Sequence, residues 1–215
     1  IALAVELGID VIVCDHHMPE SHLPKAFAVL DPMRPDCNYP FKGLSGCGVG
    51  FKLAQALEQN AGRGVDRLIP FLDLVAIAIG ADVVSVAGEN RILAYHGVEQ
   101  IKLNPRPAIK ALLGGKSVVD AHLSDFNFSI APKINAAGRI KHGEYAVALL
   151  TTKEAEKARQ LTLEIEEFNK ERRSTEQQVT EEALKLVKAE GDRRSTVVRA
   201  PHWHKGVIGI VASRL

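Results

Sequence analysis

The pattern of hydrophobic and polar positions divides the first 113 residues into short apolar strands and longer helices. Residues 9–14 form an apolar run whose last four positions predict a buried strand of a parallel sheet, and residues 26–30 are a second strand candidate. Residues 71–86 are the most apolar stretch and contain a predicted helix that ends near residue 81. Further helices are predicted at 2–7, 44–59, 91–103 and 107–113. This order of elements indicates an α/β fold.

A different pattern begins at Thr151, which has the spacing of a capping box with Glu154. No Gly or Pro follows before Gly191, and apolar residues recur on one helical stripe whose middle is polar. We predict one helix of roughly 40 residues, about 60 Å long, that bridges two domains and is solvated at its middle. Gly191-Asp192 is expected to end it, and a strand at 195–198 with a helix start at 206–215 predicts the beginning of a second α/β domain.

Composition places the chain among soluble globular proteins, with 46% hydrophobic and 25% charged residues. No charge-free apolar run approaches the roughly 18 residues of a membrane span. The cysteines, Cys14, Cys37 and Cys47, lack zinc spacing and predict reduced, buried thiols and a cytoplasmic location. Because the chain opens on Ile1 within a predicted helix and ends at Leu215 within an apolar segment, we expect a piece of a longer protein.

The two halves of the chain differ in charge. Residues 1–100 contain 7 basic and 12 acidic residues, a net charge of −5, whereas residues 101–215 contain 20 basic and 14 acidic residues, a net charge of +6. An acidic first half suits a metal site and a basic second half suits a polyanion, although chance and one charged helix would also produce such a difference.

Three ligand-type side chains, Asp15, His16 and His17, follow the predicted strand at 9–14 directly. Ligands of open α/β sheets bind beyond the carboxyl ends of the strands, so the triplet is a candidate for metal or phosphate chemistry. The alternative is a polar loop whose histidines are merely hydrogen-bonded. Asp82 is a second candidate, because a carboxylate in such apolar surroundings is costly unless it is paired or bound to metal. A structural cap or a salt bridge explains Asp82 equally well.

Read together, five segments resemble the DHH phosphoesterase superfamily, and within it the single-strand-specific 5′→3′ DNA exonucleases. The resemblance covers essentially the whole chain. The segments are Val-Ile-Val-Cys-Asp-His-His at 11–17, Leu-Ser-Gly-Cys-Gly-Val-Gly-Phe-Lys-Leu at 44–53, Ala-Asp-Val-Val at 81–84, Ile-Asn-Ala-Ala-Gly-Arg at 134–139, and Trp-His-Lys-Gly-Val-Ile-Gly-Ile-Val-Ala-Ser-Arg at 203–214.

The resemblance implies a parallel-sheet DHH domain with flanking helices at 1–150, an interdomain helix at 151–190, and the start of a DHH-associated domain at 191–215. It implies that His16 and Asp82 are ligands of one metal, that His17 faces the scissile phosphate, and that Asp15 supports His17. It also implies a path for single-stranded DNA lined by Asn135, Arg139, Trp203, His204 and Arg214.

The implied reaction is hydrolysis of phosphodiesters by two divalent cations, Mn²⁺ or Mg²⁺, in DNA repair and recombination, together with helicases and single-strand-binding protein. The family's upstream aspartate motifs and its glycine-histidine segment are not in this sequence, and Lys133 stands where an arginine is common. We therefore expect the 215-residue chain alone to be inactive. The alternatives are a DHH phosphodiesterase of short oligonucleotides, cyclic dinucleotides or pyrophosphate, and a non-catalytic nucleic-acid-binding scaffold.

Overall fold

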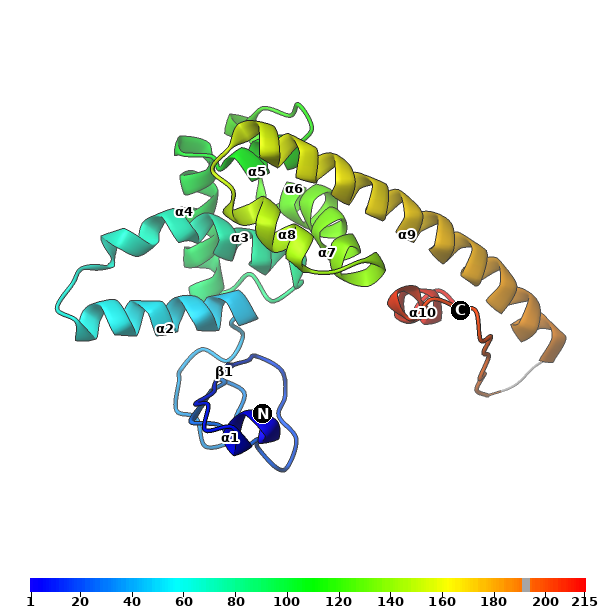
Figure 1. The fold of residues 1–215 in the computed structure, drawn as a ribbon, viewed down its shortest axis with the longest axis horizontal. Helices are drawn as coiled ribbons and strands as arrows, with labels where there is room; N and C mark the ends of the chain where they lie inside the picture. Colours follow the sequence, from blue (N-terminus) through cyan, green and yellow to red (C-terminus); the bar gives the residue numbers. More distant parts are fainter. Residues whose placement is uncertain (191–193) are drawn as a thin grey trace. The chain divides into compact units, whose positions relative to one another are not determined.

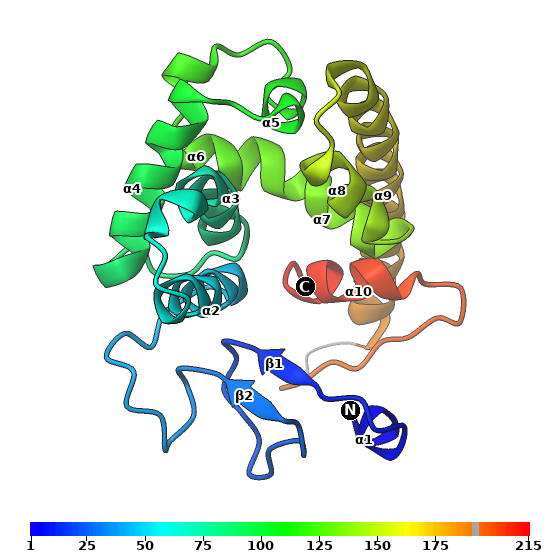
Figure 2. The same ribbon diagram turned by 60° about the vertical axis from the view of Figure 1, so that its left-hand side comes forward.

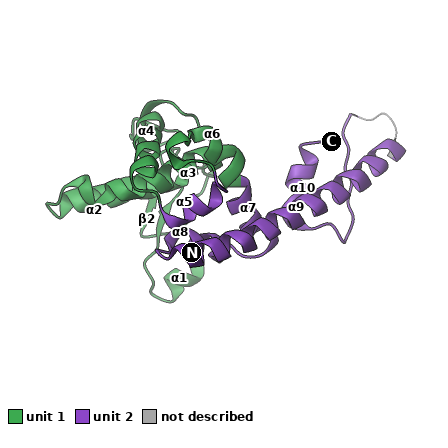
Figure 3. Cartoon of the chain, turned by 90° about the horizontal axis from the view of Figure 1, so that it is seen from above, with its two compact units in different colours: residues 1–105, 116–131 green, residues 106–115, 132–215 purple. Residues whose placement is uncertain are grey.

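The computed structural model describes residues 1–190 and 194–215, which form two compact units (Figure 3). Unit 1 comprises residues 1–105 and 116–131, and unit 2 comprises residues 106–115 and 132–215. Among the described residues, no helix combines the length and the apolar character that crossing a bilayer would require.

Unit 1 contains a parallel pair of short strands, as the sequence predicts (Figure 2). Strand β1 (Ile12–Cys14) pairs with β2 (Ala28–Leu30), with Ile12 opposite Ala28 and Cys14 opposite Leu30. The expected burial of β1 is wrong, because Ile12 is 51% exposed and Cys14 is also exposed. Cys47 is exposed and Cys37 is half-buried, so the expectation of three buried thiols is wrong too. An apolar strand is buried only where other elements cover its faces. The described residues leave open the face of the strand pair on which Ile12 and Cys14 lie.

Four α-helices and a 3₁₀ segment account for most of the remaining structure of residues 1–105: α1 (Ala2–Glu6), α2 (Gly46–Asn60), η1 (Val65–Phe71), α3 (Leu72–Ala81) and α4 (Gly88–Leu103). Each predicted helix of this region is present within a few residues. The Ser45 hydroxyl caps α2 by accepting a hydrogen bond of 3.1 Å from the Gly48 backbone N–H.

The core of unit 1 lies between α3 and α4, where Val75, Ile79 and Ala94 are buried together. Gly97 of α4 allows this packing, because a Cβ there would lie 2.2 Å from the Leu72 carbonyl oxygen. Residues 116–131 complete unit 1 with η2 (Val118–Asp120), α6 (Leu123–Asp125) and a π-helical turn, η3 (Phe126–Ile130).

Unit 2 is built around one long helix (Figure 1), and its elements are α5 (Pro107–Leu112), α7 (Ala131–Ile140), α8 (Glu144–Thr151), α9 (Ala155–Glu190) and α10 (Lys205–Ala212). Helix α9 has 36 residues, about 54 Å at 1.5 Å per residue. It begins four residues later than predicted, because α8 continues to Thr151 and the Thr152 hydroxyl accepts the Glu154 N–H at 3.3 Å. The division into domains at 150 and 190 stays a prediction.

Two expectations for unit 2 are wrong. The middle of α9 is not solvated on all sides: most of its residues are exposed, but Glu176 is buried and forms ion pairs with both Arg172 of α9 and Arg214 beyond α10. The predicted strand at 195–198 is absent, since these residues have no strand partner among the described part of the chain. The predicted helix after residue 205 is α10, whereas the expected end of α9 at Gly191-Asp192 lies outside the described residues.

Candidate metal centre and nucleic-acid interface

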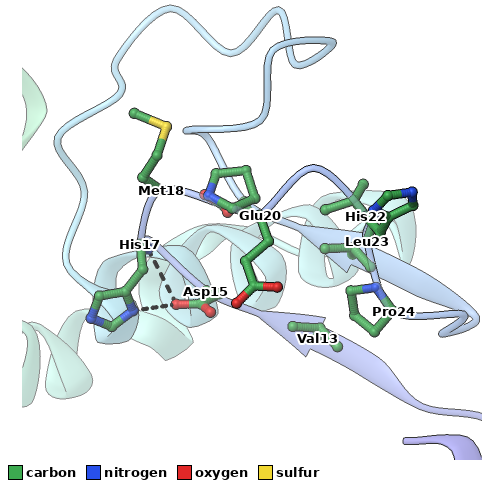
Figure 4. A pocket seen from close by; sticks show the side chains of 11 residues that line it. Val13, Asp15, His17, Met18, Glu20, His22, Leu23 and Pro24 are labelled. Atoms are coloured by element: carbon green, nitrogen blue, oxygen red, sulfur yellow. Dashed lines mark hydrogen bonds and ion pairs between the residues drawn. The ribbon is translucent and has the colours of Figure 1, made fainter.

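The turn after β1 is organised by the carboxylate of Asp15. Its Oδ1 accepts hydrogen bonds from the backbone N–H groups of His16, at 2.7 Å, and His17, at 3.2 Å. The same oxygen lies 2.7 Å from Nδ1 of the His17 ring (Figure 4). A short acidic side chain that bonds to the two following amides is the usual way for Asp to set a turn. The strand end thus fixes both the backbone and the ring of His17.

The contact between Asp15 and His17 also shifts the pKa of both groups. The hydrogen bond from His17 holds the pKa of the Asp15 carboxyl below its usual value, and the same bond raises the pKa of His17. With Nδ1 directed at Asp15, the other ring nitrogen of His17, Nε2, faces away from the carboxylate (Figure 4). The His17 side chain is 76% exposed, so Nε2 is accessible to a substrate.

The His16 ring contacts a different carboxylate, that of Asp82. Its Nε2 lies 3.1 Å from Oδ2 of Asp82, although the two residues are 66 positions apart. The His16 side chain is only 14% exposed, and the start of α2 lies against it, since a Cβ on Gly46 would be 3.4 Å from His16 Cδ2. Asp82 is the C-cap of α3, and its N–H donates to Ala78 at 2.9 Å. The structure therefore brings together the two residues that the sequence nominates for one metal.

The donor atoms at this point suit a divalent cation. One ligand-type atom from each of Asp15, His16 and His17 lies within 4.8 Å of the other two, and Asp82 adds a carboxylate beside His16. A mixed set of imidazole nitrogen and carboxylate oxygen is compatible with Mn²⁺, whereas Mg²⁺ favours oxygen more strongly. These residues fit part of the coordination shell of such an ion.

A pocket of about 370 Å³ opens beside the turn (Figure 4). Asp15 and His17 line it together with Glu20 and Asp31, neither of which the sequence analysis singled out. Asp31 had a usable signal, because it directly follows β2 just as Asp15 directly follows β1. Glu20 lies in a polar loop, and no pattern in the sequence marks it as a site residue.

The five residues nominated for the DNA path all lie in unit 2. Asn135 and Arg139 are exposed on α7, and Arg139 Nη1 donates to the Gly206 carbonyl at 3.1 Å. His204 caps α10, where its Nδ1 accepts the Gly206 N–H at 3.1 Å. The structure therefore brings Arg139 together with the start of α10.

Trp203 has a packing role in the structure. It lies against the buried cluster that α9 and α10 form, and its Nε1–H donates to Oε2 of Glu182 at 2.9 Å. His202 Nε2 lies 2.8 Å from the same oxygen. The hydrogen bonds from Trp203 and then His202 hold the pKa of Glu182 below its usual value. Base stacking by Trp203 remains a proposal.

Arg214, the fifth nominated residue, is held by an acidic partner. Its Nη2 pairs with one oxygen of Glu176 and Arg172 pairs with the other, while only 5% of the Glu176 side chain is exposed. Arg172, Arg173 and Arg214 line a pocket of about 570 Å³. Guanidinium groups around a pocket suit phosphate recognition, and one buried carboxylate offsets part of their charge.

Residues 1–79 match the DHH family, N-terminal domain. Over 99% of its length, the chain is 42% identical to the single-stranded-DNA-specific exonuclease RecJ of Bacillus subtilis strain 168, of which it covers 27%. It is 39% identical, again over 99% of its length, to RecJ of Escherichia coli K12, of which it covers 40%.

Solved structures agree with the sequence matches. The crystal structure of RecJ from Thermus thermophilus in complex with Mn²⁺ superposes with a TM-score of 0.82 at 33% identity, over 98% of this chain and 31% of that one. An exonuclease RecJ bound to manganese gives a TM-score of 0.81 at 32% identity, over 99% of this chain and 53% of that one. The chain thus spans well under half the length of these curated relatives, from 27 to 40%. Residues 1–79 thus match the DHH family model, and the chain is similar to the RecJ exonucleases over the part of them that it spans.

Proposed function

We propose that the chain supplies part of the metal centre and part of the strand-binding surface of a RecJ-type exonuclease, which hydrolyses single-stranded DNA from 5′ to 3′ in repair and recombination. The observation that carries this proposal is the 3.1 Å approach of His16 Nε2 to Asp82 Oδ2 beside Asp15 and His17. Its support is the similarity to RecJ structures solved with Mn²⁺ or Mg²⁺.

In this proposal His16 and Asp82 hold a divalent cation, and His17 serves the substrate. Bound divalent ions would activate water for attack and offset the charge that develops on the phosphate. Asp15 orients the His17 ring and stabilises its protonated form, so that Nε2–H can donate to a phosphate oxygen at the scissile bond. The four residues thereby divide into two that bind metal, His17, which binds the phosphate, and Asp15, which orients His17.

In this proposal, residues of unit 2 bind the single-stranded DNA. Asn135, Arg139, Trp203, His204 and Arg214 would contact phosphates and bases of single-stranded DNA. Cooperation with helicases and single-strand-binding protein, a cytoplasmic location, and the division into a DHH domain (1–150), an interdomain helix (151–190) and a DHH-associated domain (191–215) belong to the same proposal.

The test is a nuclease assay with a RecJ-length protein that contains this chain, supplied with Mn²⁺. We expect rapid release of nucleotides from long 5′-phosphorylated single strands, with little activity on duplexes, dinucleotides or pyrophosphate. Asp82→Asn should abolish the activity, and Asp36→Asn, which removes an exposed carboxylate that pairs with Arg34, should not. Preference for dinucleotides or pyrophosphate would instead support a small-substrate DHH hydrolase. Strand binding without hydrolysis would support a scaffold.

A further inference from the structure

The two proposed metal ligands rest on two separate loops of unit 1. His16 lies against Gly46, which opens α2 at the end of the loop that follows β2. Asp82 ends α3 and begins the loop that leads into α4 at Gly88. The 3.1 Å spacing between His16 and Asp82 therefore depends on how these two loops are held together.

The loop after Asp82 starts with a strained residue. Val83 has a φ of +53°, and it is the one non-glycine residue with positive φ in the described part of the chain. The left-handed conformation is common after a helix end, but Gly is the usual residue there and a β-branched side chain is an outlier. The Val83 side chain is 76% exposed, so packing does not offset the cost. Contacts elsewhere must hold the backbone in this conformation.

The start of α4 provides those contacts through three consecutive residues, Gly88, Glu89 and Asn90. Asn90 is fully buried, and its Nδ2 donates to the carbonyl of Gly43, at 2.6 Å, and to that of Ser85, at 2.9 Å. One amide group thus joins the loop before α2 to the loop after Asp82. Asn90 Oδ1 is buried and has no hydrogen-bond partner among the described residues, so half of the amide's polar group is unsatisfied.

The two neighbours of Asn90 reinforce the same connection. Gly88, with a φ of +51°, lies so close to Phe41 that a Cβ there would be 2.7 Å from the ring. Glu89 accepts from the Tyr39 hydroxyl at 2.6 Å and pairs with Lys52 of α2 at 2.7 Å. Each of these contacts of Gly88 and Glu89 joins residues 39–52 to residues 85–90.

We propose that Asn90 is a positioning residue of the metal site: its amide ties the two loops together, sustains the strained backbone at Val83 and so keeps Asp82 beside His16. This inference rests on the proposed function, because it takes His16 and Asp82 as the metal ligands. Without the tie, Val83 relaxes toward a conformation that a β-branched residue prefers, and Asp82 moves away from His16.

The experiment uses the 215-residue chain and Mn²⁺ as the probe. Paramagnetic broadening of the His16 ring signals in NMR spectra reports Mn²⁺ bound at that residue, even when binding is weak. We expect Asn90→Ala to raise the Mn²⁺ concentration needed for half-maximal broadening by about tenfold or more, as loss of a residue that orients a metal ligand does. Asn169→Ala, which removes a buried asparagine of unit 2 that bonds to Arg172, should leave it unchanged.

A double variant separates positioning from general destabilisation. Glycine adopts the left-handed conformation without strain, so Val83→Gly in the Asn90→Ala background should restore most of the lost Mn²⁺ response. If Asn90 were only a packing residue, the added flexibility of glycine would not restore it. An unchanged response in Asn90→Ala, or no rescue by Val83→Gly, would overturn the proposal.

A second pair of variants tests the inference if Asn90→Ala does not fold, and the unmodified chain tests the metal site itself. If Asn90→Ala does not fold, Gly88→Ala tests the same connection through Phe41, with Gly50→Ala as control because a Cβ at Gly50 meets nothing within 4 Å. We expect Gly88→Ala to weaken the response and Gly50→Ala to preserve it, and equal responses would overturn the inference. Absence of site-specific broadening at His16 in the unmodified chain would instead count against the proposed metal site itself.

Discussion

At the residue scale, the adjacent side chains of His16 and His17 have different partners and therefore different expected roles. His16 meets Asp82, whereas His17 meets Asp15 and exposes its other ring nitrogen. In an active protein that contains this chain, His16→Ala should weaken Mn²⁺ binding, and excess Mn²⁺ should partly restore activity. His17→Ala should leave Mn²⁺ affinity nearly intact and lower the rate roughly 100-fold, as loss of a transition-state donor does. Calorimetric titration and rate measurements on the two variants check this, and equal loss of affinity in both would refute the division of roles.

Also at the residue scale, Glu182 and Trp203 make a pH-dependent contact that one signal can follow. Trp203 is the only tryptophan in the chain, so its fluorescence reports this contact alone. The folded pKa of Glu182 lies below the unfolded value of 4.5, because Trp203 and His202 donate to its carboxylate. The stabilisation is therefore fully present above pH 4.5 and is lost as the pH falls through the lower folded pKa.

We expect a change in Trp203 fluorescence with a midpoint below pH 4.5. Glu182→Gln keeps an acceptor near the indole but removes the titrating group, so this variant should lack the transition. Lys185 and His202 are the other charged or titratable groups that act on Glu182, and His202→Gln should move the midpoint upward. A midpoint at or above 4.5 in the unmodified chain would contradict the assignment.

At the scale of elements, the packing of α3 on α4 depends on the small size of Gly97. A Cβ there would lie 2.2 Å from the Leu72 carbonyl oxygen and 2.6 Å from the Ala76 side chain, so the helices would have to separate. We expect Gly97→Ala to lower the free energy of unfolding by about 1–3 kcal/mol, the usual cost of overpacking. Urea unfolding measures the change.

Gly50→Ala is the matched control, because Gly50 lies inside α2 with open space around it. Alanine is the better helix former, so this substitution should raise the stability by roughly 0.5–1 kcal/mol. Similar effects of the two substitutions would show that the α3–α4 contact is not as close as the structure has it.

At the scale of the whole molecule, we expect the 215-residue chain to fold but not to cleave DNA. His16 and Asp82 are the two nominated ligands for one metal, and a reaction with two metals needs several more carboxylates to hold both ions. A divalent ion held by two side chains stays largely hydrated and weakly bound. A Mn²⁺-supplemented assay on 5′-phosphorylated single strands, run beside a RecJ-length protein, tests this. Activity within about tenfold of the longer protein would mean that further ligands are dispensable, and the account of the site would have to be abandoned.

The sequence by itself determined the features that depend on neighbours along the chain. Periodicity located α9 almost to its full length, and the run ending at Cys14 located β1 and the ligand-type residues behind it. A capping pattern predicted the start of α9 to within a few residues, although Thr151 belongs to α8 and the Thr152 hydroxyl is the one that accepts the Glu154 N–H. Helical periodicity, strand alternation and end signals are local, so one sequence carries them.

Tertiary structure alone decided the features that join distant segments. The apolar pattern of β1 predicted burial, but burial depends on which elements cover a strand, and Ile12 is exposed. The polar middle of α9 predicted solvent, but Arg214, 38 positions beyond Glu176, covers that carboxylate. The connection that Asn90 makes between two loops carried no local signal, because Gly43, its partner in the other loop, lies 47 positions away. Pairings over such separations are set by the packing of whole elements, and the hydrophobic pattern of one segment does not contain them.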